Sequence, residues 1–143
     1  MGEREEKLAH LGRVAQEVFA LLAEAQTPLK AYDLLWRLQN KRGAPAPPST
    51  IYRGLNTLVR EGMAHKIRSL SAYVACAAPT GAHEPALFIC DVCKSVLELN
   101  GDAAAKAVAA GARHGGFEPR QVALEFFGLC EACGSIGDKP RSK

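Results

Sequence analysis

Four of the five cysteines form two Cys-x-x-Cys pairs, and this spacing is the strongest chemical signal in the chain. Cys90 and Cys93 form the first pair, and Cys130 and Cys133 form the second. Two residues between thiolates allow both sulfurs of a pair to face one ion, so two pairs complete a tetrahedral zinc site. A redox dithiol usually occurs as a single pair, and plain buried cysteines are a further alternative. The duplication favours a structural zinc site at these four positions.

The remaining cysteine, Cys76, belongs to a second set of metal-ligand types. His65 opens one short strand-like stretch and Cys76 ends the next, so a hairpin would bring them close together. His83 stands in the link that follows, and Glu98 lies in a strand after the first cysteine pair. Two His, one Cys and one Glu suit tetrahedral zinc. Taken singly, a histidine is more often a surface residue, and Cys76 would also serve as a small core hydrophobe.

A predicted helix from Ser49 to about Arg60 has the pattern of a DNA-reading element. Ser49 is placed to cap the helix, and Gly62 to close it. The apolar sector contains Ile51, Leu55, Leu58 and Val59. The opposite sector and its border carry Ser49, Tyr52, Arg53, Asn56, Thr57 and Arg60. Arginine pairs bidentately with guanine, and amide and hydroxyl groups reach base edges. Most amphipathic surface helices, however, contact only water.

The charge of the chain is concentrated around this helix. The whole chain has a formal net charge of +3, but residues 30–68 hold eight basic residues against two acidic ones. The basic residues are Lys30, Arg37, Lys41, Arg42, Arg53, Arg60, Lys66 and Arg68. Such a local basic stripe is typical of a protein with a polyanionic partner, although a solvated surface explains the charge equally well.

The elements that position these residues predict an α+β chain of two domains. Helices from Leu8 to before Thr27, over about 30–41 and over 49–60, followed by a hairpin at 64–68 and 72–76, form a winged helix-turn-helix. The second region has strands at 86–89, 96–99 and 121–127 and a helix at 102–114. We therefore expect a winged helix over 1–80, a hinge over 81–85, a zinc-stapled α/β domain over 86–136 and a disordered tail over 137–143.

Composition narrows the class of protein further. Hydrophobic residues make up 48% of the chain, yet no apolar run approaches the roughly 20 residues needed to span a bilayer. The first residues are acidic and polar, unlike a signal peptide, so we expect a cytoplasmic protein with no membrane partner. A reducing compartment argues against disulfides and again favours metal ligation by the cysteines.

Several motifs resemble those of the ferric uptake regulator family. The run Pro-Ser-Thr-Ile-Tyr-Arg-Gly-Leu-Asn-Thr-Leu at 48–58, followed by Gly62, resembles its recognition helix. Residues 31–35, 65–66, 73–76 and 88–93 resemble its zinc uptake regulator branch, and the match covers about residues 8–135. The resemblance implies a winged-helix DNA-binding domain joined to an α/β dimerisation domain. It also implies a zinc-responsive transcriptional repressor that binds palindromic operator DNA as a homodimer.

The resemblance also implies roles for individual residues. The four paired cysteines correspond to the structural zinc site, and the sensory ligands fall on His65, Cys76, His83 and Glu98, giving two zinc ions per chain. DNA-contacting positions fall on Tyr32, Tyr52 and Arg53. The iron- and peroxide-sensing branches usually carry a His-rich run before the first cysteine pair. The single His83 in that stretch therefore favours zinc.

Three alternatives remain at this point. A sister regulator would sense iron, manganese, nickel or peroxide. A zinc enzyme such as a deaminase needs His-x-Glu, then Pro-Cys-x-x-Cys, with an open metal position. Here Ile89 precedes Cys90 and four thiolates would close the site, so we expect no enzyme and no small-molecule substrate other than the metal ion. A zinc-ribbon-like interaction module would leave the basic region without a role.

Overall fold

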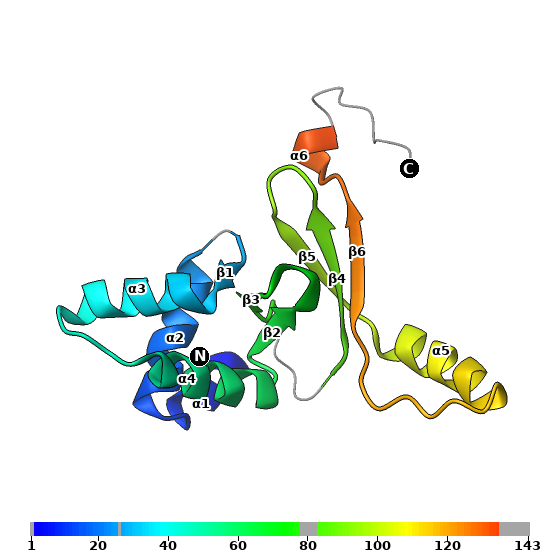
Figure 1. The fold of residues 1–143 in the computed structure, drawn as a ribbon, viewed down its shortest axis with the longest axis horizontal. Helices are drawn as coiled ribbons and strands as arrows, with labels where there is room; N and C mark the ends of the chain where they lie inside the picture. The colour runs from blue at the N-terminus through cyan, green and yellow to red at the C-terminus, as the bar shows by residue number, and fades with distance from the viewer. Residues whose placement is uncertain (1, 26, 78–82, 135–143) are drawn as a thin grey trace. The chain divides into compact units, whose positions relative to one another are not determined.

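The computed structural model describes residues 2–25, 27–77 and 83–134. The chain divides into two compact units, Met1–Ala82 and His83–Lys143, and each contains a three-stranded sheet (Figure 1). Residues 81–82 of the predicted hinge and the whole predicted tail, 137–143, lie outside the described residues.

The first unit begins with four helices, one more than the sequence predicts. They are α1 (Glu3–Ala9), α2 (Arg13–Glu24), α3 (Ala31–Arg42) and α4 (Pro48–Arg60). The prediction of one continuous helix from Leu8 is wrong. Gly12 adopts an extended conformation (φ −63°, ψ 161°) as the N-cap of α2, and this separates α2 from α1. The periodicity of the apolar residues does not register such a break, because both helices direct apolar residues towards the same core.

The core of the first unit is built by α2, α3 and α4. Leu34, Leu35 and Leu38 of α3 are all buried. They pack in one cluster with apolar residues of α2 and α4, such as Val18 and Leu55, which are fully buried. The helices are therefore held together by a shared apolar interior.

Helix α4 differs from the prediction at its N-terminal end and agrees with it at its C-terminal end. Pro47 is the N-cap and Pro48 is the first helical residue, so the prediction that Ser49 caps the helix is wrong. Proline is favoured at the first helical position because its φ is already helical and it lacks the N–H that would go unpaired there. Val59 is 41% exposed and does not belong to the buried face. Gly62 has φ +72° just after the helix, as predicted.

A three-stranded antiparallel sheet completes the winged helix. Strands β2 (Ala64–Ile67) and β3 (Ala72–Ala75) form the predicted hairpin around the 3-10 turn η1 (Arg68–Leu70). A third strand, β1 (Leu29–Lys30), pairs with β3 and gives the order β1-β3-β2. With only two residues, β1 is too short for an alternating pattern to reveal it. The N-terminal winged helix-turn-helix fold is confirmed.

The second unit follows the predicted order of elements. It comprises β4 (Pro85–Cys90), β5 (Val96–Asn100), α5 (Asp102–His114), β6 (Leu124–Gly128) and the short helix α6 (Glu131–Gly134). Strand β4 lies between β5, to which it is antiparallel, and β6, to which it is parallel. A parallel pair needs a crossover connection, and α5 lies in it. The C-terminal α/β fold is thus confirmed, although the last strand begins at Leu124 rather than at 121.

Within the described residues, no helix combines the length and apolar character that a membrane span requires.

Candidate metal centres and nucleic-acid interface

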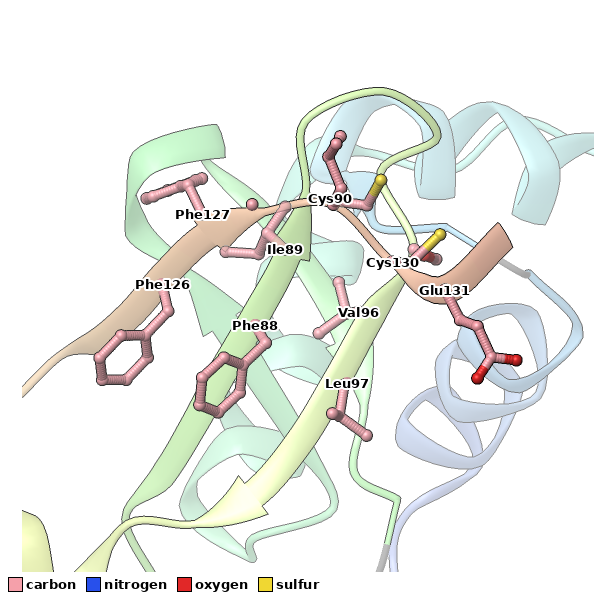
Figure 2. Close-up of a pocket in the computed structure, with 12 residues that line it drawn as sticks. Phe88, Ile89, Cys90, Val96, Leu97, Phe126, Phe127, Cys130 and Glu131 are labelled. Carbon is pink, nitrogen blue, oxygen red and sulfur yellow. The ribbon is translucent and has the colours of Figure 1, made fainter. Parts of the chain in front are cut away.

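The two cysteine pairs converge at one end of the sheet of the second unit. Cys90 ends β4, and the turn after it is held by a hydrogen bond from the Asp91 N–H to the Gly128 carbonyl at 2.8 Å. Cys130 follows β6 and Cys133 lies on α6. The four sulfurs lie within 4.8 Å of one another, and Cys93 Sγ and Cys130 Sγ are 3.7 Å apart. Figure 2 labels two of the four, Cys90 and Cys130. The predicted four-sulfur arrangement is therefore geometrically suited to a single ion.

Hydrogen bonds within the cluster shift the pKa values of the cysteine thiols. Hydrogen bonds from the backbone of Cys130, and next from that of Cys93, lower the pKa of Cys90 to about 6. The pKa of Cys130 is also lowered, mainly by the backbone of Cys133, whose N–H lies 3.5 Å from the Cys130 sulfur. Hydrogen bonding to Cys130 and Cys90 raises the pKa of Cys133 to about 12. This thiol keeps its proton and shares it with the neighbouring sulfurs. Four sulfur donors fit the ligand preference of zinc once the remaining thiols have lost their protons.

The first unit holds two of the four predicted sensory ligands. His65 lies on β2 opposite Val74, and Cys76 directly follows β3, where its N–H donates to the Met63 carbonyl at 2.8 Å. Because side chains alternate along a strand, His65 and Cys76 share one face as diagonal neighbours. His65 is 7% exposed and Cys76 1% exposed. The hairpin thus places an imidazole and a thiol together in a buried environment.

The second unit holds the other two. His83 Nε2 lies 3.1 Å from Glu98 Oε2, and both side chains are more than nine-tenths buried. The corner between β5 and α5 fixes the backbone beside His83. The Glu84 N–H donates to Asp102 Oδ1 at 2.8 Å, and the Gly101 N–H donates to the Glu84 carbonyl at 2.7 Å. Each unit therefore carries one buried pair of zinc-ligand types.

The residues predicted to contact DNA lie on the surface of the first unit. On α4, Tyr52 is 48% exposed, Thr57 is half-buried, and the other predicted residues are exposed: Ser49, Arg53, Asn56 and Arg60. Tyr32, in the first turn of α3, is 77% exposed. Trp36, which no sequence motif singles out, follows Tyr32 by one turn and is 67% exposed. The i, i+4 spacing was the signal that could have identified this aromatic pair.

The second unit exposes an unusual amount of apolar surface. Leu97, Leu99 and Phe126 are between 45% and 60% exposed on one face of its sheet, where Phe126 stacks on Phe88 with ring centroids 4.6 Å apart (Figure 2). A hollow of about 470 Å³ lies among these strands and extends to the Cys90 and Cys130 end. Val108 of α5 is 70% exposed. A surface of this kind is typical of a protein–protein interface.

Comparison with known proteins identifies relatives of this architecture. The zinc uptake regulation protein of Escherichia coli (strain K12) is 37% identical over 120 residues, which are 82% of this chain and 68% of that protein. The structure of a zinc uptake regulator complexed with zinc and DNA has a TM-score of 0.83 at 31% identity, covering 96% of this chain and 99% of the other. The crystal structure of holo XcZur has a TM-score of 0.77 at 36% identity, covering 87% and 86%. No family model matches the sequence.

The similarity to each of these relatives extends over most of both chains. The protein therefore belongs to the ferric uptake regulator family, in its zinc uptake regulator branch.

Proposed function

We propose that this protein is a zinc-responsive transcriptional repressor that binds palindromic operator DNA as a dimer when zinc occupies a sensory site at the hinge. The observation that carries the proposal is the division of the ligands. His65 and Cys76 lie in the first unit, and His83 and Glu98 lie in the second. The curated relative is a regulator, so the enzyme alternative is set aside. An operator target also places its action in the cytoplasm.

One zinc ion has a structural role in this proposal. It is bound by Cys90, Cys93, Cys130 and Cys133, whose sulfurs are already gathered within 4.8 Å. Zinc bound by them would cross-link the turn after β4 to the short helix α6. A small unit with few buried apolar residues gains stability from such a link. Four thiolates leave no open position for a substrate or a reactive water.

The second zinc ion has the regulatory role. Its ligands are His65, Cys76, His83 and Glu98, so zinc binding requires both units at once and restricts their relative orientation. Zinc shifts the equilibrium towards the DNA-competent arrangement only by its differential affinity for that arrangement. A coupling free energy of about 1–3 kcal/mol is typical of allosteric systems.

The DNA interface is formed by α4 and the start of α3. Helix α4 presents Arg53 and Arg60 together with Asn56 and Thr57 on the side opposite its buried leucines. In a helix-turn-helix the second helix enters the major groove while the first crosses the backbone, which places Tyr32 near the sugar–phosphate chain. Ser49 and Tyr52, in the first turns of α4, complete the proposed contact surface.

A homodimer is supported by the exposed apolar residues of the second unit. Leu97, Leu99 and Phe126 on the sheet, with Val108 on α5, would be removed from water by a second copy of the same surface. Helix α5 has one buried residue, Ala105, among those described, so most of its surface is available for an interface. A two-fold dimer presents two recognition helices to the two halves of a palindrome.

The central test measures operator binding as a function of buffered free zinc. A palindromic duplex is first selected in vitro with zinc-loaded protein. Cys76→Ser and His83→Ala should each shift binding to much higher zinc concentrations or abolish its zinc dependence. Metal analysis before and after mild chelation should find two zinc ions per chain, of which the labile one is needed for tight DNA binding.

The same assay separates the proposal from its closest alternative. If iron, manganese or nickel raised operator affinity at buffered concentrations where zinc did not, the protein would be a sister metalloregulator. Unchanged zinc dependence in both the Cys76→Ser and His83→Ala variants would overturn the assignment of the sensory site.

A further inference from the structure

We propose that Arg4, in helix α1, is a positioning residue for the sensory site, because it holds the peptide that carries Cys76. The inference rests on the proposed function, and it adds a role for the N-terminal helix that neither the cysteine spacing nor the recognition-helix motif indicates. It concerns contacts within the first unit alone.

The contact joins residues that are far apart in the sequence. Arg4 Nη2 donates hydrogen bonds to the Cys76 carbonyl at 3.2 Å and to the Ala77 carbonyl at 2.8 Å. The guanidinium carbon of Arg4 lies 5.9 Å from the ring centroid of Phe19, which is a buried residue of α2. The charged group is therefore stacked on an aromatic ring while it binds two successive carbonyls. These contacts restrain the guanidinium of the half-buried Arg4 side chain.

The contact completes the restraint of the Cys76 backbone. Strand β3 ends at Ala75, so Cys76 lies just beyond the last strand pair of the hairpin. Its N–H donates to the Met63 carbonyl at 2.8 Å, and its carbonyl accepts from Arg4. With both backbone polar groups held, the direction of the Cα–Cβ bond that carries the thiol is restrained. A ligand held in this way loses less conformational freedom when it binds a metal.

Helix α1 makes few other contacts that could affect the β2–β3 hairpin, which is the wing of the winged helix. None of its residues is fully buried, and Leu8 packs only partly against the core. Arg4 therefore provides a specific polar connection between α1 and the wing. Outer-shell partners of metal ligands typically change metal affinity about 10–100-fold when they are removed. We expect Arg4→Ala to weaken zinc binding at the sensory site about tenfold.

The experiment compares the full-length chain with Arg4→Ala, Arg4→Lys and Arg13→Ala. Zinc affinity of the labile site is measured by competition with a chelator, and operator binding is measured over buffered free zinc. Arg4→Ala should shift both midpoints about tenfold to higher zinc, whereas operator affinity at saturating zinc should stay within about twofold of the wild type. Arg4→Lys keeps the charge and an N–H donor and should shift less. Arg13→Ala, which removes an arginine that is 87% exposed, should behave as the wild type.

A double-mutant cycle with Cys76→Ser distinguishes positioning from general stability. If Arg4 acts through Cys76, adding Arg4→Ala to Cys76→Ser should cause no further loss of zinc affinity, because the held ligand is already absent. Cobalt substitution gives a spectroscopic readout. The sulfur-to-cobalt charge-transfer band should persist in Arg4→Ala, but should appear at higher cobalt concentration than in the wild type.

The outcomes separate this inference from the proposed function. If Cys76→Ser and His83→Ala shift the zinc midpoint but Arg4→Ala and Arg4→Lys do not, the role of Arg4 is wrong and the sensory site stands. An Arg4→Ala loss that persists undiminished in the Cys76→Ser background also overturns the role of Arg4. If zinc dependence is unchanged in both ligand variants, the proposed function itself fails. Thermal unfolding of each variant checks that it is folded. If Arg4→Ala does not fold, the zinc midpoint of Arg4→Lys provides the test in its place.

Discussion

At the scale of single residues, the four paired cysteines illustrate how backbone geometry would prepare the proposed metal site. Hydrogen bonds from the backbone of Cys130 and Cys93 lower the pKa of Cys90 to about 6, so this sulfur is a thiolate at neutral pH without any metal. Cys133, whose pKa is raised to about 12, keeps its proton within the same cluster. Zinc binding must displace protons from cysteines that still carry them. The pattern of pKa shifts therefore predicts how many protons zinc releases.

Zinc uptake by the metal-stripped site should release fewer than four protons at about pH 7.5, because Cys90 is already deprotonated there. Since the pKa of Cys90 is lowered, its thiolate is present above about pH 6 and is lost below it. Proton release should therefore rise by about one as the pH falls through 6. Calorimetry of zinc binding to Cys76→Ser protein, in buffers of different ionisation enthalpy, measures this number for the four-cysteine site alone. Release of four protons at about pH 7.5 would contradict the assignment.

Some features of the candidate site could be predicted from the sequence, and others depend on contacts between distant residues. The spacing within each Cys-x-x-Cys pair predicted that its two sulfurs would face one ion, because such a turn is a local structure. The presence of two such pairs predicted that they would meet at one site. The contact between His83 and Glu98 lies beside a corner formed by Gly101 and Asp102, which no local pattern encodes. The contact of Arg4 with Cys76 spans 72 positions and is equally invisible to periodicity.

At the scale of elements, the sequence predicted regular segments well and their boundaries less well. Helix α5 and the β2–β3 hairpin were predicted because their patterns are long or paired with a clear turn. Two features were missed: the break between α1 and α2, across which the apolar periodicity continues, and strand β1, which is too short to show an alternating pattern. At the start of α4, a general preference for serine caps was overridden by Pro48, whose fixed φ suits the first helical position.

Gly54 lets α4 approach α2 closely, and its replacement by alanine should destabilise the protein. A Cβ at this position would lie 2.9 Å from Val18 Cγ2 and 3.1 Å from Val14 Cγ1, and Val18 is fully buried. Crowding of this kind costs about 1–3 kcal/mol, which exceeds the gain of up to about 1 kcal/mol from helix propensity. Chemical denaturation should show a net loss of free energy of unfolding. Operator affinity should also fall, because α4 must move to relieve the crowding. Zinc affinity should stay unchanged.

Gly111→Ala on α5 is the matched control, because a Cβ there meets nothing within 4 Å. This substitution should raise the free energy of unfolding by about 0.5–1 kcal/mol through helix propensity alone. If Gly54→Ala were as stabilising as Gly111→Ala, the close packing of α2 on α4 would not constrain the recognition helix.

At the scale of the whole molecule, the two units differ in how they are stabilised. The main cluster of buried apolar residues lies entirely between Ala15 and Tyr73, within the first unit. In the described part of the second unit, the buried residues of the core are Ala86, Leu87, Ile89, Cys90, Ala105 and Cys133. Two of these six are cysteines of the metal centre, and much of the remaining apolar surface is exposed. We therefore expect the second unit to need both zinc and a partner.

The partner is expected to cover the apolar face that includes Leu97, which is 60% exposed. Leu97→Asp should dissociate the dimer, because a carboxylate is tolerated in water but is costly in an apolar interface. Sedimentation should show a monomer, and binding to the palindrome should weaken strongly. Trp36→Ser, which removes an exposed aromatic side chain from the first unit, should leave the dimer intact. A dimer that survives Leu97→Asp would place the interface elsewhere.

Loss of the structural zinc should unfold the second unit and spare the first. Cys93→Ser removes one ligand at an exposed position, so its direct effect on packing is small and its main effect is on the metal. Hydrogen exchange should then show lost protection in β4, β5 and β6, while α2, α3 and α4 stay protected by their own core. Cys76→Ser, which removes a buried sulfur from the first unit, should leave the strands of the second unit protected. If both units lost protection together in Cys93→Ser, they would form one cooperative structure, and a hinged switch between independently folded halves could not operate.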